Sequence, residues 1–316
     1  MSTFKALLQR EYWEHRGAFL KTPLIIGIVM GITLLLIYFF TDRVDLVMNS
    51  GQLSELGSKS LSAIDPKNIK LGLDAFMLFT AYIYHFILFI IVFFFLLGSL
   101  YDDRKDGSIL FWKSLPVSDT QTVLSKLITA TIVAPLIFTV GLILSHILIF
   151  MLLSGILLLN GINPFSFIWA NINFISNWGA FIIGCFIQSL WALPIYGWLL
   201  FSSSFSKRRP FLLAIFAPLT VAFAWYWYVA FTNFDVIQAG LFKTILFLFS
   251  KAASPFTSGI SFSADEIDFD PRDQSGLEVI YSMINGLSNT SLYYGLIFAV
   301  IAVAVAIYVR RFRNTT

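Results

Sequence analysis

Six long runs of apolar residues dominate the pattern of the chain, and polar or charged stretches separate each run from the next. A helix needs about 20 consecutive apolar residues to cross the roughly 30 Å hydrocarbon core of a bilayer. Each run reaches that length, so each predicts a transmembrane helix. The predicted spans are 20–40, 77–100, 124–153, 174–201, 211–231 and 291–309.

A shorter apolar run at 237–249 precedes the sixth span. Lys243 lies near its middle, and a central lysine costs about 2.5–3.5 kcal/mol on membrane-insertion scales. We therefore expect a re-entrant or interfacial segment, with a seventh crossing as the alternative. The segment belongs to a predicted external loop, 232–290, which we expect to be exposed because of its acidic residues and prolines: Pro255, Asp265, Glu266, Asp268, Asp270, Pro271, Asp273 and Glu278.

Lysine and arginine gather on one side of the predicted membrane. Short cytoplasmic loops carry an excess of these residues, and 14 of the 21 flank the spans on one side. The distribution predicts that both termini are cytoplasmic and that 41–76 and 232–290 are external. The 14 residues are Lys5, Arg10, Arg16, Lys21, Arg104, Lys105, Lys113, Lys126, Lys207, Arg208, Arg209, Arg310, Arg311 and Arg313.

Composition supports a membrane protein. The chain has 316 residues, of which 58% are hydrophobic and 12% charged, about half the charged share of a soluble domain. This excludes a water-soluble enzyme. The net charge of +3 is too small and too dispersed to indicate a nucleic-acid partner. A single cysteine, Cys185, excludes an internal disulfide and a thiolate-rich metal site.

The usual catalytic and cofactor motifs are absent from the sequence. There is no G-x-x-x-x-G-K-[ST] phosphate loop, so we expect no nucleotide site in this chain. His15, His85 and His146 show no metal-ligand spacing, and we expect them to pack or to form hydrogen bonds. No charged residue lies well inside a predicted span, where ion-driven carriers need one. We therefore predict no catalytic residues and no resident metal.

Span 174–201 contains polar residues at membrane depth. Gln188, Ser189, Trp191 and Tyr196 are candidates for a substrate path. The alternative is hydrogen bonding between helices near a kink at Pro194, because neighbouring helices can satisfy polar groups inside a bilayer.

The N-terminal residues 1–19 have the pattern of an amphipathic helix, with the remainder of its surface polar, including Glu11 and Glu14. Such a helix is expected to lie along the inner membrane surface before the first span. Its apolar face would carry Phe4, Leu7, Leu8 and Tyr12.

The loop 103–118, between the second and third spans, predicts a short helix. Asp106 is a suitable N-cap, and the helix must end near Leu115 because the residue before Pro116 disfavours helical backbone. Ser118 followed by Gln121 has capping-box spacing, so a second helix is expected to begin there and to continue into the third span.

The short helix is thereby held off the membrane with Ile109, Phe111, Trp112 and Leu115 on it. Exposed apolar residues in such a place indicate a docking surface for another protein. The alternative is an amphipathic turn in the headgroups, with Trp112 as an interfacial anchor.

These features resemble the type 2 permeases of ATP-binding-cassette (ABC) exporters. Their first cytoplasmic loop follows E-R-E-x-G-[ST]-x-x-x-L-x-S-L-P-[VI]-[ST]; this chain has Asp-Arg-Lys-Asp-Gly-Ser at 103–108 and Lys-Ser-Leu-Pro-Val-Ser at 113–118, with Lys126 after it. Gln9-Arg10-Glu11 and Arg16 match the N-terminal helix of the family. The departures are aspartates at 103 and 106 and the bulky Phe111-Trp112 pair.

The resemblance implies an all-α polytopic permease over 1–316, with six spans, a cytoplasmic coupling helix and an external re-entrant segment. It implies a second permease copy, identical or a sister chain, and two separate ATPase subunits that carry ATP and Mg²⁺. Split chains of this kind are typical of a prokaryotic inner membrane. The residues implied in coupling are Arg104, Lys105, Asp106, Gly107, Ser108, Phe111, Trp112, Leu115 and Pro116.

Members of this family export drugs, peptides, lipids or glycan precursors, and the sequence does not choose among them. A membrane subunit of an ATPase-driven envelope assembly or maturation complex is the alternative, because such a complex can have the same coupling loop. A membrane-embedded enzyme and a secondary carrier fit less well, since convergent titratable groups and intramembrane charges are lacking.

Overall fold

The computed structural model describes residues 3–48, 66–232, 241–253, 261–263, 266–268 and 276–312. These residues form an all-α polytopic membrane protein. Six of its helices are long and apolar enough to cross a membrane. The predicted loop residues Pro255, Asp265, Asp270, Pro271 and Asp273 lie outside the described residues, as does Arg313.

Each predicted span lies within one continuous helical stretch, and most stretches extend beyond it. Polar end turns account for the extra length. The stretches consist of α1 (Thr3–Arg16), a π-helical turn (Gly17–Lys21) and α2 (Thr22–Met48); α4 (Pro66–Lys105); α6 (Asp119–Ile128), a π-helical turn (Thr129–Val133) and α7 (Ala134–Leu159); α8 (Phe174–Phe205); α9 (Pro210–Thr232); and α12 (Thr290–Phe312).

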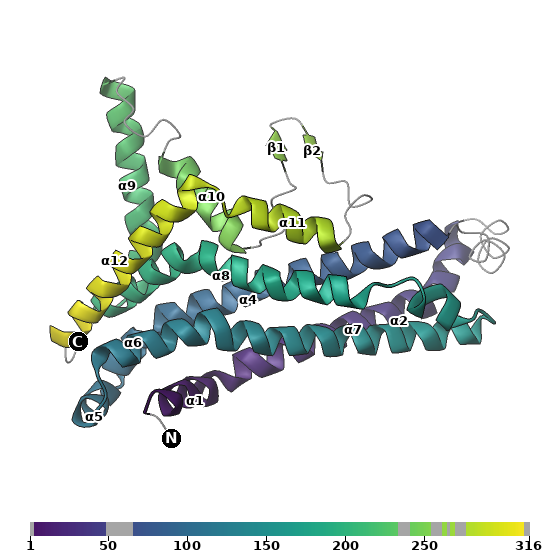
Figure 1. Ribbon diagram of the computed structural model, residues 1–316, viewed down its shortest axis with the longest axis horizontal. Coiled ribbons are helices and arrows are strands. Elements are labelled where there is room, and N and C mark those ends of the chain that lie inside the picture. Colours follow the sequence, from purple (N-terminus) through teal and green to yellow (C-terminus); the bar gives the residue numbers. More distant parts are fainter. Residues whose placement is uncertain are drawn as a thin grey trace.

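Helices α2, α4, α7 and α8 form an elongated bundle, and α12 packs along α8 (Figure 1). Helices α2 and α7 approach closely because small residues face each other: a Cβ at Gly27 would collide with Ser145, and one at Gly141 with Pro23. The Tyr84 hydroxyl of α4 joins this contact, since it donates to the Pro23 carbonyl at 2.7 Å.

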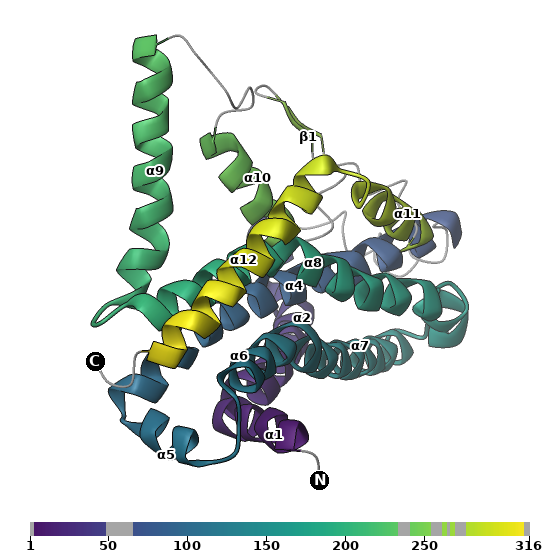
Figure 2. The same cartoon turned by 60° about the vertical axis from the view of Figure 1, so that its left-hand side comes forward.

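Both ends of the described chain lie at one end of the bundle, together with the short helix α5 (Ser108–Ser114). We call this the α5 end. Figure 2 shows α1, α5, α6 and the last turn of α12 gathered there. The opposite end holds the start of α4, the end of α7, a short π-helical turn (Phe165–Trp169) and the start of α8.

Helix α9 stands away from the bundle (Figures 1 and 2). Of its residues only Ala214 and Ala222 are buried, whereas large side chains such as Phe223 and Tyr226 are exposed. An apolar helix exposed on most of its sides is suited to lipid rather than to water.

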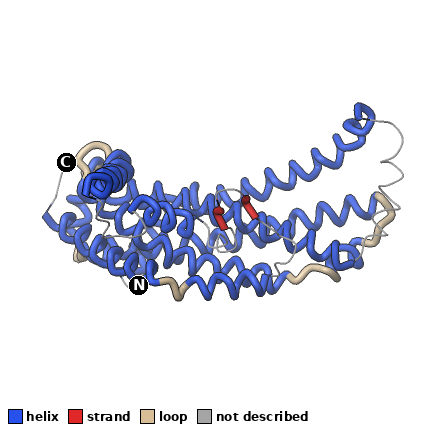
Figure 3. The backbone as a smooth tube through the Cα atoms, turned by 90° about the horizontal axis from the view of Figure 1, so that it is seen from above, coloured by secondary structure: helices blue, strands red, loops and turns tan. Residues whose placement is uncertain are grey.

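The predicted re-entrant segment 237–249 overlaps α10 (Leu241–Ala253), and its first four residues lie outside the described residues. At 1.5 Å per residue it reaches roughly 20 Å, less than a bilayer core. A second short helix, α11 (Gly276–Gly286), was not predicted. Strands β1 (Ser261–Ser263) and β2 (Glu266–Asp268) pair antiparallel beside these helices, over the middle of the bundle (Figure 3).

Candidate functional site

Helix α5 projects from the α5 end on a tight turn. The predicted N-cap, Asp106, is wrong: the cap is Gly107, whose φ of 71° places it in the left-handed region. Glycine enters that region without steric cost. The helix therefore begins after Gly107, one residue later than predicted, and without a side-chain cap. The helix ends at Ser114 and Leu115 is extended, as predicted from Pro116.

The outer face of α5 is apolar. Ile109 is fully buried and holds the helix on the bundle, whereas Leu110, Phe111 and Leu115 are 56%, 60% and 37% exposed. Pro116 is exposed as well. The predicted capping box is present: Ser118 Oγ accepts from the Gln121 amide, and the Gln121 side chain accepts from the Ser118 amide. Helix α6 therefore begins at a fixed place after the loop.

A buried ion cluster lies directly beneath α5, centred on Asp103. Its carboxylate contacts three cations: Arg10 Nη2 at 3.1 Å, Arg310 Nη1 at 3.3 Å and Lys126 Nζ at 3.6 Å. Asp103 lies beyond the apolar segment 77–100. Burial alone would raise the pKa of the Asp103 carboxyl, but the three cations outweigh it and hold this pKa below its usual value. The carboxylate is therefore ionised at neutral pH.

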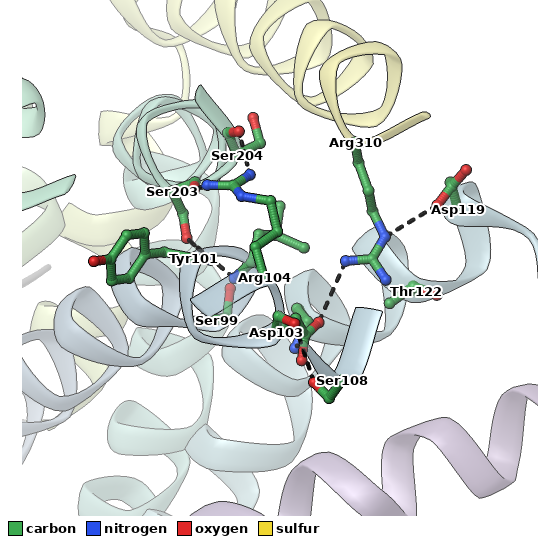
Figure 4. A network of polar contacts seen from close by, with 12 residues as sticks. Ser99, Tyr101, Asp103, Arg104, Ser108, Asp119, Thr122, Ser203, Ser204 and Arg310 are labelled. Carbon is green, nitrogen blue, oxygen red and sulfur yellow. Dashed lines mark hydrogen bonds and ion pairs between the residues drawn. The ribbon is translucent and has the colours of Figure 1, made fainter. Parts of the chain in front are cut away.

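Two further carboxylates complete the cluster. Lys126 Nζ lies 3.0 and 3.2 Å from the oxygens of Glu11, and both side chains are almost completely buried. Arg310 Nε donates to Asp119 at 3.1 Å (Figure 4). Within the cluster, three cations thus face three carboxylates, so its charges balance; Arg10 and Asp119 are partly buried and the other four are buried. Glu11, predicted on the polar part of the surface of the N-terminal helix, is buried because α1 packs this side against α6.

Arg104 is also buried, and it holds the end of α8. Its guanidinium donates to the backbone carbonyls of Ser203, Ser204 and Ser206 (Figure 4). The last carbonyls of a helix lack intrahelical donors and carry partial negative charge, so an arginine there is stabilising. Arg104 is buried, so its charge faces the protein interior and not the surface.

Of the remaining implied coupling residues, some make contacts within the protein and others are exposed on its surface. The Arg10 guanidinium covers the Trp112 ring at 3.8 Å from its centroid, so Trp112 is partly buried. Ser108 Oγ donates to the Asp103 carbonyl at 3.2 Å. Lys105 and Asp106 are exposed.

Three of the polar residues at depth on α8, Gln188, Trp191 and Tyr196, are buried and Ser189 is partly buried. Gln188 and Ser189 hydrogen-bond to neighbouring segments. Gln188 Oε1 accepts from His85 Nδ1, and Gln188 Nε2 donates to the carbonyl of His85 and to the carbonyls of Ala252 and Ala253 at the end of α10. Ser189 donates to the Thr131 carbonyl in a π-helical turn. Tyr196 lies in the main core. Trp191 lines a hollow next to α10 and α11.

Two histidines join helices, as predicted. His85 Nδ1 lies 2.7 Å from Gln188 Oε1. His146 Nε2 lies 2.5 Å from Thr80 Oγ1, and its Nδ1 accepts from the Trp178 ring at 3.2 Å. His15 lies near Glu11 and Glu14, with ligand atoms within 4.8 Å of one another. Both carboxylates already pair with Lys126 and Arg10 respectively, so this group supports no metal site.

The two segments that carry the family resemblance are far apart in sequence and meet in this cluster. Sequence reasoning did not identify the roles of Asp119 and Arg310, since nothing in the local pattern distinguishes them from surface charges. Comparison of the chain with models of protein families, with curated proteins and with solved structures finds no match in any of the three.

Proposed function

We propose that this chain is the transmembrane permease subunit of an ABC-type exporter. It forms the substrate path with a second permease copy, and its α5 docks into a groove on a separate ATPase subunit that binds ATP and Mg²⁺. The observation that carries the proposal is the apolar outer face of α5. Leu110 and Phe111 are exposed on α5 and Leu115 directly after its last residue, and the helix is held from below by the contact of Trp112 with Arg10 of the ion cluster.

The charge arrangement supports a role in force transmission. Asp103 sits in the last turn of α4, immediately before α5, and contacts residues of α1, α6 and α12. Lys113 on α5 also donates to the Arg311 carbonyl of α12 at 3.1 Å. A displacement of α5 would therefore be transmitted to α1, α6 and α12 through the ionic contacts of Asp103. A purely interfacial turn needs no such anchoring.

The position of the α5 end supports a cytoplasmic orientation, because an ATPase that uses cellular ATP must reach α5 from the cytoplasm. Most lysine and arginine residues predicted on that side flank helix ends there. In this proposal both termini are cytoplasmic and the protein resides in a prokaryotic inner membrane.

Co-purification tests the coupling role. The tagged chain is isolated from its native membrane in mild detergent, and bound subunits are identified and assayed for ATP hydrolysis. We expect an ATPase with a phosphate loop to co-purify with the wild-type chain. A Phe111→Ala/Leu115→Ala variant should bind it about 10- to 100-fold more weakly, because a few large apolar residues dominate interface energy.

Phe165→Ala is the matched control, since Phe165 is equally exposed on a short helical turn at the opposite end. Retention of the ATPase by the Phe111→Ala/Leu115→Ala variant would refute the coupling assignment. An ATPase that binds through α5 without ATP-driven solute movement in reconstituted vesicles would favour the envelope-assembly alternative.

Cysteine labelling tests the orientation. Lys207→Cys lies at an exposed turn of the α5 end and Leu159→Cys at the exposed opposite end. The native Cys185 is buried and should not react. A membrane-impermeant maleimide should label Leu159→Cys in intact cells and Lys207→Cys only after permeabilisation. The reverse pattern would place the α5 end outside and exclude coupling to a cytoplasmic ATPase.

A further inference from the structure

We propose that a hollow between α8, α10 and α11 binds an amphiphile with one apolar chain and a single anionic head group. The hollow has a volume of about 300 Å³ and is lined by Ile187, Trp191, Phe247, Lys251, Ser282, Met283, Gly286 and Asn289. The proposal does not depend on export, because binding can be measured on this chain alone.

The walls of the hollow are mainly apolar. Trp191 and Ile187 contribute from α8, Phe247 from α10 and Met283 from α11. The Trp191 and Phe247 rings meet edge to face at 5.6 Å between centroids. Aromatic and methionine side chains provide broad, adaptable contact for hydrocarbon. Such a wall favours an alkyl chain over a polar solute.

Among the described residues, Lys251 is the only charged one in the lining. Its ammonium lies 5.8 Å from the Phe247 ring centroid, at the apolar wall. No carboxylate of the described residues forms an ion pair with it, which contrasts with Lys126 in the ion cluster. A half-buried cation beside hydrocarbon gains most from an anion that arrives with its own apolar chain.

The position of Lys251 is fixed by its neighbours. The next two residues, Ala252 and Ala253, accept hydrogen bonds through their carbonyls from the Gln188 side chain of α8. The end of α10 is thereby attached to α8 beside Trp191. The cation and the apolar wall thus belong to one built site.

The volume suits the head group and the first part of a single chain. At about 30 Å³ for each water-sized group, the hollow holds roughly ten non-hydrogen atoms. That accommodates a carboxylate or phosphate head with the first part of one alkyl chain. The shared chemistry is an amphiphile with one anionic head group, whether a fatty acid or an alkyl phosphate.

Photoaffinity labelling tests the site. The chain is reconstituted in nanodiscs of neutral phosphatidylcholine and exposed to diazirine-bearing dodecanoate, dodecyl phosphate or dodecanol, and the labelled residues are mapped by mass spectrometry. We expect at least one anionic probe to label the lining residues at least ten times more than dodecanol. The stronger of the two anionic probes identifies the head group.

Two variants test separately the charge of Lys251 and the volume of the hollow. Lys251→Gln should reduce labelling by the anionic probes about tenfold and leave dodecanol unchanged. Gly286→Leu should abolish labelling by all three probes, because Gly286 lines the hollow, a Cβ there meets no neighbour, and the larger side chain takes up space that the ligand needs.

Lys70→Gln, an exposed lysine at the opposite end, and Gly155→Leu, where a Cβ also meets open space, are the matched controls and should label as wild type. Equal labelling by dodecanol, or wild-type labelling of Lys251→Gln, would overturn the anionic assignment. Wild-type labelling of Gly286→Leu would show that the ligand does not occupy this hollow. Continued burial of Cys185 verifies that each variant is folded.

Discussion

The two ends of the bundle are held together by different forces. At the α5 end, Asp103, Lys126 and Arg310 form a buried network of charges. At the opposite end, the Phe150 ring packs edge to face on the Phe174 ring, with 5.8 Å between centroids. The centroids of the Phe174 and Trp178 rings are 5.2 Å apart. The buried carboxylate at that end, Asp74, accepts a hydrogen bond from the side-chain amide of Asn177 at 2.6 Å.

The two ends should differ in how they tolerate changes of side-chain chemistry. Aromatic packing is insensitive to small changes of side-chain chemistry, provided that volume is kept. A buried charge network depends on every member, because an unpaired charge in a low-dielectric interior is expensive. The α5 end is therefore specified by pairing and the opposite end by volume, and substitutions of similar shape should distinguish them.

The largest effect is expected for Lys126→Met. The substitution keeps the length of the side chain but leaves Glu11 buried without its main cation, and breaking a buried pair costs about 3–5 kcal/mol. The free energy of unfolding can be followed through the reaction rate of Cys185, which is buried in the folded chain.

Glu11→Met/Lys126→Met provides the control, because removing both members leaves no unpaired charge. It should recover most of the lost stability, since Asp103 keeps Arg10 and Arg310. A double variant as unstable as Lys126→Met would mean that packing, not pairing, determines this end.

Gly107→Val should have an intermediate effect. A Cβ at Gly107 meets no neighbour, so the cost comes from the left-handed backbone, about 1–3 kcal/mol for a non-glycine residue. If α5 is the docking element, this variant should also bind the ATPase less well. Gly107→Asn should be milder, because asparagine tolerates this conformation. Equal effects of valine and asparagine would contradict a backbone origin.

Phe150→Leu at the opposite end should cost less than about 1.5 kcal/mol, because a hydrophobic residue of similar size replaces another. Phe150 is as completely buried as Lys126. Phe150→Leu and Lys126→Met therefore compare the loss of apolar packing with the loss of a charge at equal burial. The same cysteine assay applies. A loss larger than that of Lys126→Met would reverse the proposed difference between the ends.

Glu14→Gln should have the smallest effect. Its pair with Arg10 at 2.7 Å lies at the surface, where Glu14 is 45% exposed, and exposed ion pairs contribute about 0–1 kcal/mol. Unfolding in low and high salt should differ little between this variant and the wild type. A loss comparable to Lys126→Met would show that the ion cluster extends to Glu14.

The parts of the fold that were predictable depend on local signals. The six apolar runs identified the long helices, and Ser118 with Gln121 identified the start of α6. The helix start at Gly107 was mispredicted because Asp106 is the better side-chain cap in isolation, and a left-handed turn leaves no comparable signal. Helix α11 was missed because it lies within an acidic, proline-containing stretch that is typical of a loop.

The ion cluster was only partly predictable, because its members are distant in sequence. Arg310 and Asp103 are 207 positions apart, and each is compatible with an ordinary surface charge. The family pattern pointed to Arg10, Glu11 and Lys126 without giving their geometry. Their pairing follows from packing of α1 and α12 against the loop, which the hydrophobic pattern does not specify.

The hydrogen bonds from Arg104 to the last carbonyls of α8 provide a fixed point about which that helix can tilt. A tilt of about 5° around this point would move the other end of the 32-residue helix by roughly 4 Å, at 1.5 Å per residue. Trp191, about 20 Å along the helix from the attachment, would move by roughly 2 Å. That displacement is a large fraction of the width of one alkyl chain, so small rotations beneath α5 are geometrically amplified at the hollow.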